Sequence, residues 1–226
     1  MASSSQGTGP VPAGHIRGPE DFQKAFGVSR ETLARLETYA ALLKRWQKTI
    51  NLVAPSTVND VWHRHLADSA QVFQHAPAGA SHWLDLGSGA GFPGLVIAIM
   101  AAEKGGTRHT LIESDTRKAA FLREVARETR VAVEILSARI ELPETAAKVA
   151  EVNCVTARAL APLPRLIPLV APFFSDATVG LFLKGREFAA ELEQAQLGWT
   201  FDVQLHPSVT DGEGRIVEVS RLRLKR

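Results

Sequence analysis

The sequence contains a single cysteine, Cys154, and therefore cannot form an internal disulfide. A chain without disulfides is typical of a reducing compartment, so we expect a cytoplasmic protein. Long apolar runs are also missing, because LVIAIMAA and LIPLVAPFF fall far short of the roughly 20 residues of a membrane-spanning helix. The stretch MASSSQGTGPVPAG lacks the basic start and apolar core of a secretory signal. We expect neither a membrane protein nor a secreted one.

Strong net charge and clustered metal ligands are absent as well. The formal net charge is +2 over 226 residues, which permits a polyanionic partner without requiring one. His63 and His65 are separated by one residue, but no further cluster of Cys, His or acidic residues supports them. We therefore expect no metal site. No pair of nucleophile and general base stands out either, so an enzyme of this sequence would depend on positioning.

The composition divides the chain into three parts. Residues 1–19 are rich in Ser, Gly and Pro and predict a disordered tail. Residues 20–78 predict a small helical lobe, with an apolar stripe between Ser29 and Ile50 and a second helix over about 57–75. The stretch APAGA ends this lobe. Residues 79–226 form the third part, in which short β-rich segments alternate with helical ones.

The third part predicts a mostly parallel, seven-stranded sheet. Strands that alternate with helices form a parallel sheet with helices on both faces, so the fold class is α/β. Only the last two segments lie too close together for a helix between them, and we expect an antiparallel hairpin at one end of the sheet. The seven segments lie near residues 82–87, 109–114, 131–136, 153–158, 177–184, 200–206 and 215–224.

The first predicted strand leads into a glycine-rich loop, WLDLGSGAGFPG, in which two patterns overlap. Gly89, Gly91 and Gly94 match the G-x-G-x-x-G signature of dinucleotide-binding proteins. Gly87, Gly89 and Gly91 match G-x-G-x-G with Asp85 two residues ahead, as in the first motif of S-adenosylmethionine-dependent methyltransferases. Both patterns place a tight turn at the end of a strand, where backbone approaches a ligand closely.

Two neighbouring residues favour the methyltransferase pattern. S-adenosylmethionine has no phosphate but carries an ammonium and a sulfonium, for which Asp85 is a suitable neighbour. Pro93, expected in the first helical turn, removes an N–H donor that a pyrophosphate would use. Glu113 ends the second strand, where either cofactor would need an acid for its ribose hydroxyls. A nicotinamide-dependent oxidoreductase and a non-catalytic RNA-binding protein remain the alternatives.

Several segments together resemble one family, RsmG, also called glucose-inhibited division protein B. They are LLKRWQKTINLVAPS, RHLADS, LDLGSGAGFPGLVIAI, IESDTRKAAFLREV, SARIE, TARALAPL and LFLKGRE, and the likeness runs from about Tyr39 to the end of the chain. The resemblance implies a Rossmann-like class I methyltransferase fold with S-adenosylmethionine as cofactor. It also implies methylation of N7 of a guanine in bacterial 16S rRNA, at position 527 in the standard numbering of that rRNA. The substrate would be 16S rRNA, the small ribosomal subunit or its assembly intermediate, and the protein is expected to be a monomer.

The resemblance also indicates site residues. Ile140 and Glu141 would lie at the adenine of the cofactor, and Glu113 at its ribose. Arg158, which ends the fourth strand, matches a cofactor-site arginine of the family. From their places at strand ends we expect Arg158 and Lys184 as catalytic residues, although Lys184, which ends the fifth strand, could instead contact an RNA phosphate or have no special role. The full set of expected cofactor-binding residues is Asp85, Gly87, Gly89, Gly91, Phe92, Glu113, Ile140, Glu141 and Arg158.

The remaining polar candidates stay open at this stage. His65 and Asp68 are three residues apart on a predicted helix and share a face, which fits either a local hydrogen bond or contact with the active site. Seven basic residues could contact RNA phosphates or simply be solvated: Lys44, Arg45, Lys48, Arg64, Arg117, Lys118 and Arg123. Guanine N7 carries no proton, so its methylation needs no general base.

Overall fold

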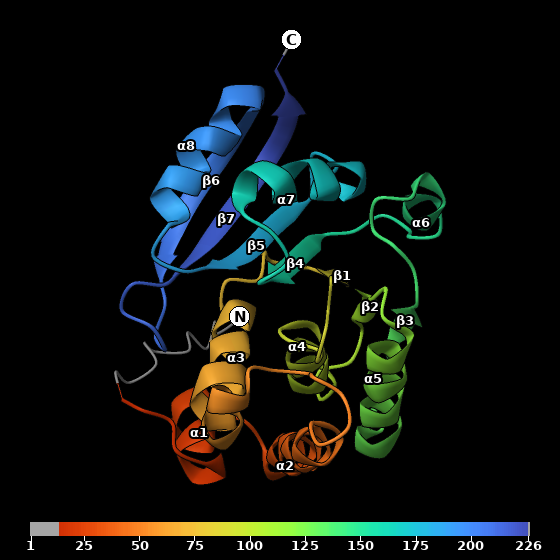
Figure 1. Cartoon of the computed structure of the whole chain (residues 1–226), viewed down its shortest axis with the longest axis vertical. Coiled ribbons are helices and arrows are strands. Elements are labelled where there is room, and N and C mark those ends of the chain that lie inside the picture. The colour runs from red at the N-terminus through yellow and green to blue at the C-terminus, as the bar shows by residue number, and fades with distance from the viewer. Residues whose placement is uncertain (1–13, 226) are drawn as a thin grey trace, which may run out of the picture.

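The computed structural model describes residues 14–225, which form a seven-stranded sheet with helices on both faces (Figure 1). The strand order is β3-β2-β1-β4-β5-β7-β6, and only β7 runs antiparallel to its neighbours β5 and β6. The predicted α/β fold, with a mostly parallel sheet and an antiparallel pair at one end, is confirmed. The strands are β1 (His82–Leu86), β2 (Arg108–Ile112), β3 (Glu134–Leu136), β4 (Cys154–Arg158), β5 (Val179–Lys184), β6 (Trp199–Pro207) and β7 (Arg215–Leu224).

The helices lie in two groups, one on each face of the sheet. On one face α7 and α8 pack against the sheet, and on the other α3, α4 and α5 do so (Figure 1). The helices are α1 (Pro19–Phe26), α2 (Arg30–Trp46), α3 (Asp68–Phe73), α4 (Gly94–Ala101), α5 (Thr116–Thr129), α6 (Pro143–Ala147), α7 (Leu163–Val170) and α8 (Phe188–Gly198). Within residues 14–225, no helix has both the length and the apolar character to cross a membrane.

Helix α4 is apolar around its whole circumference, and the rest of the protein buries it on all sides. Its sequence, GLVIAIMA, is buried except for the partly exposed Met100. Helix α2 covers it from outside, and Leu36, Tyr39 and Leu43 join one core with Leu95 of α4. Ser29 caps the N-terminus of α2, since its Oγ accepts from the backbone N–H of Thr32 at 3.1 Å. The N-terminal helices therefore form a second layer over the sheet and share its core.

The packed structure begins before residue 20. Ile16 is buried in the same core, and its backbone N–H donates to His63 Nδ1 at 3.2 Å. Helix α1 begins at Pro19 and was not predicted from the sequence. Of the tail expected over residues 1–19, residues 1–13 lie outside the described residues, and the part that follows packs on the helices.

The helix predicted over residues 57–75 is divided into three pieces. A 3₁₀ helix over Pro55–Asp60 is followed by a π-helical turn over Trp62–Ala67 and then by α3. In the π turn each hydrogen bond spans five residues, as from Asp68 N to His63 O. The extra residue in the turn changes which side chains share a face, and it sends His65 and Asp68 toward the carboxyl end of β4.

Candidate active site

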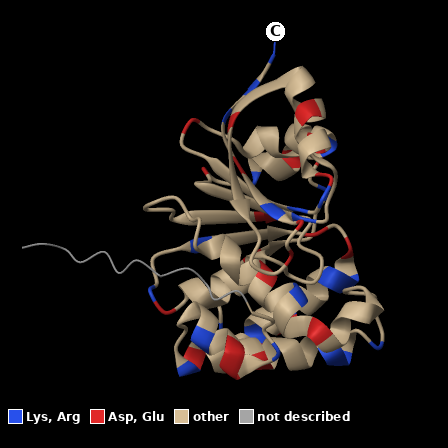
Figure 2. Ribbon diagram, turned by 90° about the vertical axis from the view of Figure 1, so that its left-hand side faces the viewer, with Lys and Arg blue, Asp and Glu red and all other residues tan. Residues whose placement is uncertain are grey.

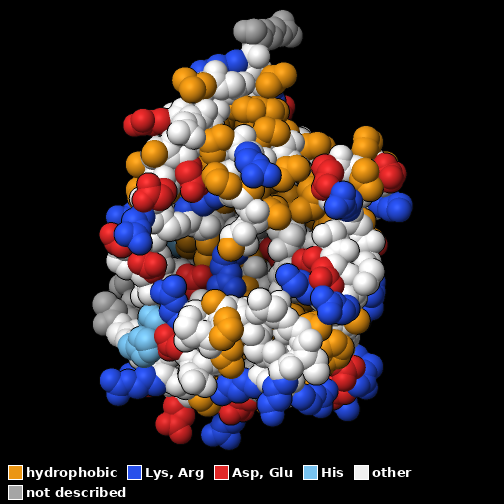
Figure 3. All heavy atoms as spheres, in the orientation of Figure 1, with side chains coloured by type: hydrophobic (Ala, Val, Ile, Leu, Met, Phe, Trp, Pro, Cys, Tyr) orange, Lys and Arg blue, Asp and Glu red, His pale blue; other side chains and the backbone are white. Residues whose placement is uncertain are grey.

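Two cavities lie side by side at the edge of the sheet where the parallel strands end. The glycine-loop cavity, about 490 Å³, is lined by residues 87–90, Phe92, Glu113, residues 138–141 and Arg158. The hairpin cavity, about 720 Å³, is lined by residues 158–162, by the π turn and by the turn between β6 and β7. Both cavities share four residues, Leu52, Arg158, Ala159 and Leu160. Figure 3 shows this hollow between the upper and lower halves of the molecule.

The glycine loop needs glycine at Gly87 and Gly89, each with a left-handed backbone. Gly87 has φ +63°, and a Cβ there would lie 2.5 Å from Cδ1 of Leu160. Gly89 has φ +55°, and its backbone N–H donates to Glu113 Oε2 at 2.7 Å. On the other side of the loop, the hydroxyl of Tyr39 donates to the carbonyl of Ala90. The loop is therefore held from both the second strand and the N-terminal helices.

Glu113 is placed to bind hydroxyl groups in the glycine-loop cavity. It is buried at the end of β2, where Oε1 accepts from Asp115 N at 2.8 Å and Oε2 accepts from Gly89 N. Each carboxylate oxygen accepts two hydrogen bonds, so both oxygens keep one free position. A ribose presents two adjacent hydroxyls, and the two oxygens of Glu113 can accept one hydrogen bond from each of them.

Phe92 forms the centre of an aromatic stack between the two cavities. Its ring is 5.3 Å from the ring of Tyr39 and 5.0 Å from that of His65, with near-parallel planes in both pairs. The guanidinium of Arg158 lies 4.8 Å from the same ring, in a cation–π arrangement. Three separate elements thus converge on one side chain, which fixes the relative positions of the loop, the π turn and β4.

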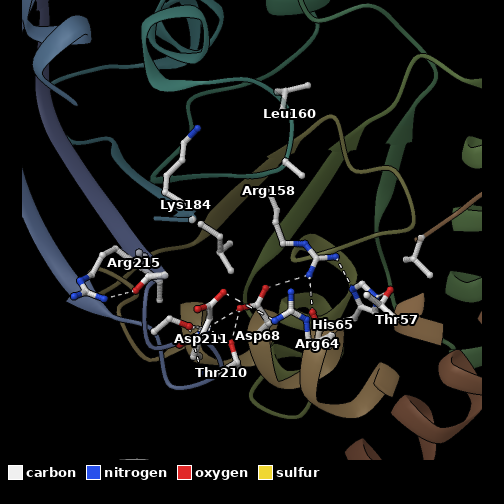
Figure 4. Close-up of a pocket in the computed structure, with 18 of the residues that line it drawn as sticks. Thr57, Arg64, His65, Asp68, Arg158, Leu160, Lys184, Thr210, Asp211 and Arg215 are labelled. Atoms are coloured by element: carbon white, nitrogen blue, oxygen red, sulfur yellow. Dashed lines mark hydrogen bonds and ion pairs between the residues drawn. The ribbon is translucent and has the colours of Figure 1, made fainter. Parts of the chain in front are cut away.

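Arg158 is held by three acceptors from the π turn and α3 (Figure 4). Nη1 donates to the carbonyl of Arg64 and to Asp68 Oδ2, both at 3.1 Å, and Nη2 lies 3.0 Å from His65 Nδ1. The side chain is only 18% exposed. The planar guanidinium can satisfy three acceptors in fixed directions, which a lysine ammonium cannot reproduce. The RHLADS segment therefore contacts Arg158, and a role of His65 and Asp68 in the active site stays a prediction.

The tautomer of His65 follows from its two neighbours. Arg158 is always a donor, so Nδ1 of His65 must be the acceptor and Nε2 must carry the proton. Nε2 lies 2.8 Å from Thr57 Oγ1, whose own hydroxyl donates to the carbonyl of Ala54. Burial, together with the positive charges of Arg158 and Arg64, lowers the pKa of His65 from 6.5 to about 3. His65 is therefore neutral at physiological pH.

We expect the C2 proton of His65 to keep a constant NMR chemical shift from about pH 8 to about pH 5, because the ring does not protonate there. Its pKa is lower in the folded chain than in the unfolded one. The neutral ring therefore contributes its full share of the unfolding free energy above pH 6.5, and that share is lost as the pH falls toward about 3. In His65→Gln, which keeps an acceptor for Arg158, this acid-induced loss should shrink. A His65 titration midpoint near 6.5 would contradict the buried, neutral ring.

Comparison with known proteins bears directly on this site. The sequence pattern of GidB, described as rRNA small subunit methyltransferase G, matches residues 32–217. The chain belongs to the GidB family. It is 48% identical over 203 residues to the ribosomal RNA small subunit methyltransferase G of Parvibaculum lavamentivorans, covering 90% of this chain and 89% of the relative. The corresponding protein of Rhodospirillum centenum is 51% identical, over 89% of this chain and 90% of the relative.

Solved structures agree on the fold. A mutant of MtNAS in complex with S-adenosylmethionine superposes with a TM-score of 0.55 at 16% identity, covering 89% of this chain and 82% of that chain. Membership of the GidB family confirms the predicted rRNA methyltransferase over the nicotinamide-dependent oxidoreductase and the non-catalytic RNA-binding protein.

Two residues expected to bind the cofactor of this GidB-family protein lie beneath the loop and line neither cavity. Asp85 accepts from Thr156 Oγ1 at 2.7 Å, while its Oδ2 is buried with no partner among the described residues. Burial raises the pKa of Asp85 to about 6. Gly91 faces the core, where a Cβ would lie 2.6 Å from Leu95 Cδ1. Both residues shape the loop from below, and a direct contact with the cofactor stays a prediction.

The other expected site residues line the cavities. Lys184 lines the hairpin cavity, but its ammonium lies 3.0 Å from Glu191 Oε2 and donates to the carbonyl of Ala161. Glu191 also accepts from the backbone N–H of Leu163 at the start of α7 at 2.9 Å. Lys184 therefore anchors the loop between β4 and α7. The expected cofactor residues that line the glycine-loop cavity are Gly87, Gly89, Phe92, Glu113, Ile140, Glu141 and Arg158.

The turn between β6 and β7 supplies site residues that the sequence did not indicate. Thr210 Oγ1 donates to Asp68 Oδ1 at 2.7 Å, and Gln71 Oε1 accepts from Val209 N at 2.8 Å. Asp211 follows and lines the hairpin cavity (Figure 4). These contacts join residues more than 130 positions apart, and the only local signal was a polar turn, PSVTDGEG.

Proposed function

We propose that this GidB-family chain transfers a methyl group from S-adenosylmethionine to N7 of a guanine in small-subunit rRNA. The observation that carries the proposal is the pair of adjacent cavities that share Arg158 at the carboxyl edge of the sheet. Such an arrangement lets a cofactor and a second ligand meet at one place. Ligands of open α/β sheets bind at this edge.

The glycine-loop cavity has the features that S-adenosylmethionine requires. Glu113 keeps a free acceptor position on each oxygen for the ribose hydroxyls. Ile140 and Glu141, which line the same cavity, would take the adenine. The backbone of Gly89 lies open to the cavity, because a Cβ there would meet only the carbonyl of Gly87, at 3.8 Å. S-adenosylmethionine bound here would supply an activated methyl group bonded to a sulfonium.

The reaction needs alignment and does not need a general base. Guanine N7 has a lone pair and no proton, so it attacks the methyl carbon while the carbon–sulfur bond breaks. Positive charge moves from sulfur to the guanine, and no proton moves. His65 is neutral, its Nδ1 accepts from Arg158 and its Nε2 is hydrogen-bonded to Thr57, so neither ring nitrogen is free to exchange a proton with substrate. The fixed side chains of Phe92 and Arg158 would hold the two reactants in line.

The RNA on either side of the target nucleotide would be bound outside the cavities, over a surface of mixed charge. Figure 2 shows Lys and Arg interspersed with Asp and Glu over the helices. Arg64, Lys118 and Arg139 line the two cavities and would contact phosphates beside the target nucleotide. We propose 16S rRNA within the small subunit or its assembly intermediate as the substrate, a monomeric enzyme and a cytoplasmic location.

Methyl transfer to small subunits tests the proposal. Subunits from a strain that lacks this gene, incubated with the protein and radiolabelled S-adenosylmethionine, should gain about one methyl group per 16S rRNA, at N7 of a single guanine. Subunits from the parent strain, already modified, should gain none. Label at another atom or in another RNA would overturn the guanine N7 assignment.

A further inference from the structure

The hairpin cavity is large enough to receive a whole nucleotide. Its volume of about 720 Å³ falls within the range of roughly 300–1,000 Å³ usual for ligand pockets. It adjoins the glycine-loop cavity at Arg158 and Leu160, so a base inserted in the hairpin cavity would contact a cofactor bound in the glycine-loop cavity. Enzymes that modify a base turn it out of the RNA into a pocket of this kind.

Three carboxylates line the hairpin cavity, and two of them are closely paired. Asp68 lies 3.1 Å from Arg158, and Glu191 lies 3.0 Å from Lys184. Asp211 is different, because its nearest basic atom, on Arg64, is 4.0 Å from Oδ2. This distance is too long for a hydrogen bond. Of the three carboxylates, Asp211 is therefore the one without a close cationic partner among the described residues, and its Oδ2 has capacity for a ligand.

Asp211 is also held in place by its turn. Its Oδ1 accepts from Glu213 N, and its carbonyl accepts from Gly214 N, both at 3.0 Å. The preceding Thr210 is bonded to Asp68, and its carbonyl lies 3.1 Å from His63 Nε2. A carboxylate on a turn fixed this way presents one oxygen in a constant direction, as recognition of a single base edge requires.

Guanine offers the donors that this carboxylate would accept. Its N1–H and 2-amino group lie side by side on the Watson–Crick edge, whereas adenine has an acceptor at N1. That edge lies on the side of the base remote from N7. In Figure 4, Asp211 lies on the far side of Asp68 from Arg158, with Arg215 farther out. A guanine with N7 at Arg158 would direct its Watson–Crick edge toward Asp211.

We propose that the hairpin cavity receives the extruded guanine and that Asp211 accepts hydrogen bonds from its N1–H and 2-amino group. The inference rests on the proposed function and adds how the base is selected. The carboxylate also contributes to the rate, because the guanine becomes positively charged as the methyl group is transferred. Asp211 thus acts as both a specificity determinant and an electrostatic stabiliser.

The test compares Asp211→Asn with wild type on two assembled subunits, carrying guanosine or inosine at the modified position. Inosine lacks only the 2-amino group. Wild type should methylate guanosine about tenfold or more faster than inosine, in terms of kcat/KM. Asp211→Asn keeps the acceptor for Glu213 N but turns an amide toward the base. It should lose about 10- to 100-fold on guanosine and much of its preference over inosine, with S-adenosylmethionine affinity unchanged.

Glu213→Gln is the matched control, since it removes the same charge from the same turn at a residue that does not line the cavity. It should behave as wild type. An Asp211→Asn enzyme that is slower but keeps the full preference for guanosine would overturn the proposal, as would a wild type indifferent to the 2-amino group. If wild type transfers no methyl group to N7 of guanosine, the proposed function itself falls. The two failures are therefore distinguishable.

Discussion

Replacing Arg158 with methionine is expected to reduce methyl transfer on the order of 100- to 1,000-fold, the largest effect among the polar residues of the site. The guanidinium stands where both cavities meet, stacked on Phe92 and bonded to His65 and Asp68. Methionine retains much of the apolar stem but neither the charge nor the donors. The chain should still fold, since Asp68 keeps its donors from Gln71 and Thr210.

Two further variants make the Arg158 result specific. Arg158→Lys keeps the charge but cannot donate to three acceptors in fixed directions, so it should recover only a small part of the rate. Arg165→Met removes an exposed arginine of α7 that lines neither cavity and should leave the rate unchanged. Single-turnover methyl transfer is the measurement, with S-adenosylmethionine affinity from calorimetry. A rate within threefold of wild type for Arg158→Met would contradict a role at the junction.

Gly89→Asp is expected to weaken S-adenosylmethionine binding by at least about 100-fold while leaving the protein folded. The backbone at Gly89 faces the glycine-loop cavity and donates to Glu113, so a side chain there would occupy the cavity with a second negative charge. A Cβ meets nothing closer than 3.8 Å, so the main structural cost is the left-handed backbone, about 1–2 kcal/mol.

Gly105→Asp is the control for Gly89→Asp. Gly105 also has a left-handed backbone, with φ +63°, and a Cβ there has nothing within 4 Å. It lies in the loop after α4, away from both cavities. Both variants should lose similar unfolding free energy in denaturant, and only Gly89→Asp should lose cofactor affinity by calorimetry. Equal affinity in the two variants would show that the loop does not bind the cofactor.

The sheet was predictable because its signal is local and periodic. Short apolar strands separated by helices and glycine turns are typical of the α/β class. The connection between the last two strands is too short for a helix, which predicts that they pair antiparallel. The π turn was not predictable, since a helix of either kind carries the same apolar positions over a few residues. Helix α1 was missed because it has only eight residues between Gly18 and Gly27, too few for periodicity to show.

The candidate site was predictable in part, for a similar reason. Residues such as Gly87, Glu113 and Arg158 are placed by strand ends, and a parallel sheet brings strand ends together. Asp85 also lies near a strand end, but its side chain is on the face where Gly94 at the start of α4 packs against it, so it is buried beneath the loop. Asp211 belongs to a turn whose position depends on contacts with α3 and the π turn, far away in the chain. A local sequence pattern cannot predict contacts between segments so far apart in the chain.

The hydroxyl of Tyr39, bonded to the carbonyl of Ala90, has a thermodynamic consequence. Tyr39 belongs to α2 and to its core, while Ala90 belongs to the loop that would hold the cofactor. Ordering the loop and ordering α2 are therefore coupled, and by reciprocity each favours the other by the same free energy. The N-terminal helices are consequently part of the binding equilibrium. A change in α2 that moves the Tyr39 hydroxyl is therefore expected to alter cofactor affinity although Tyr39 does not line the cavity.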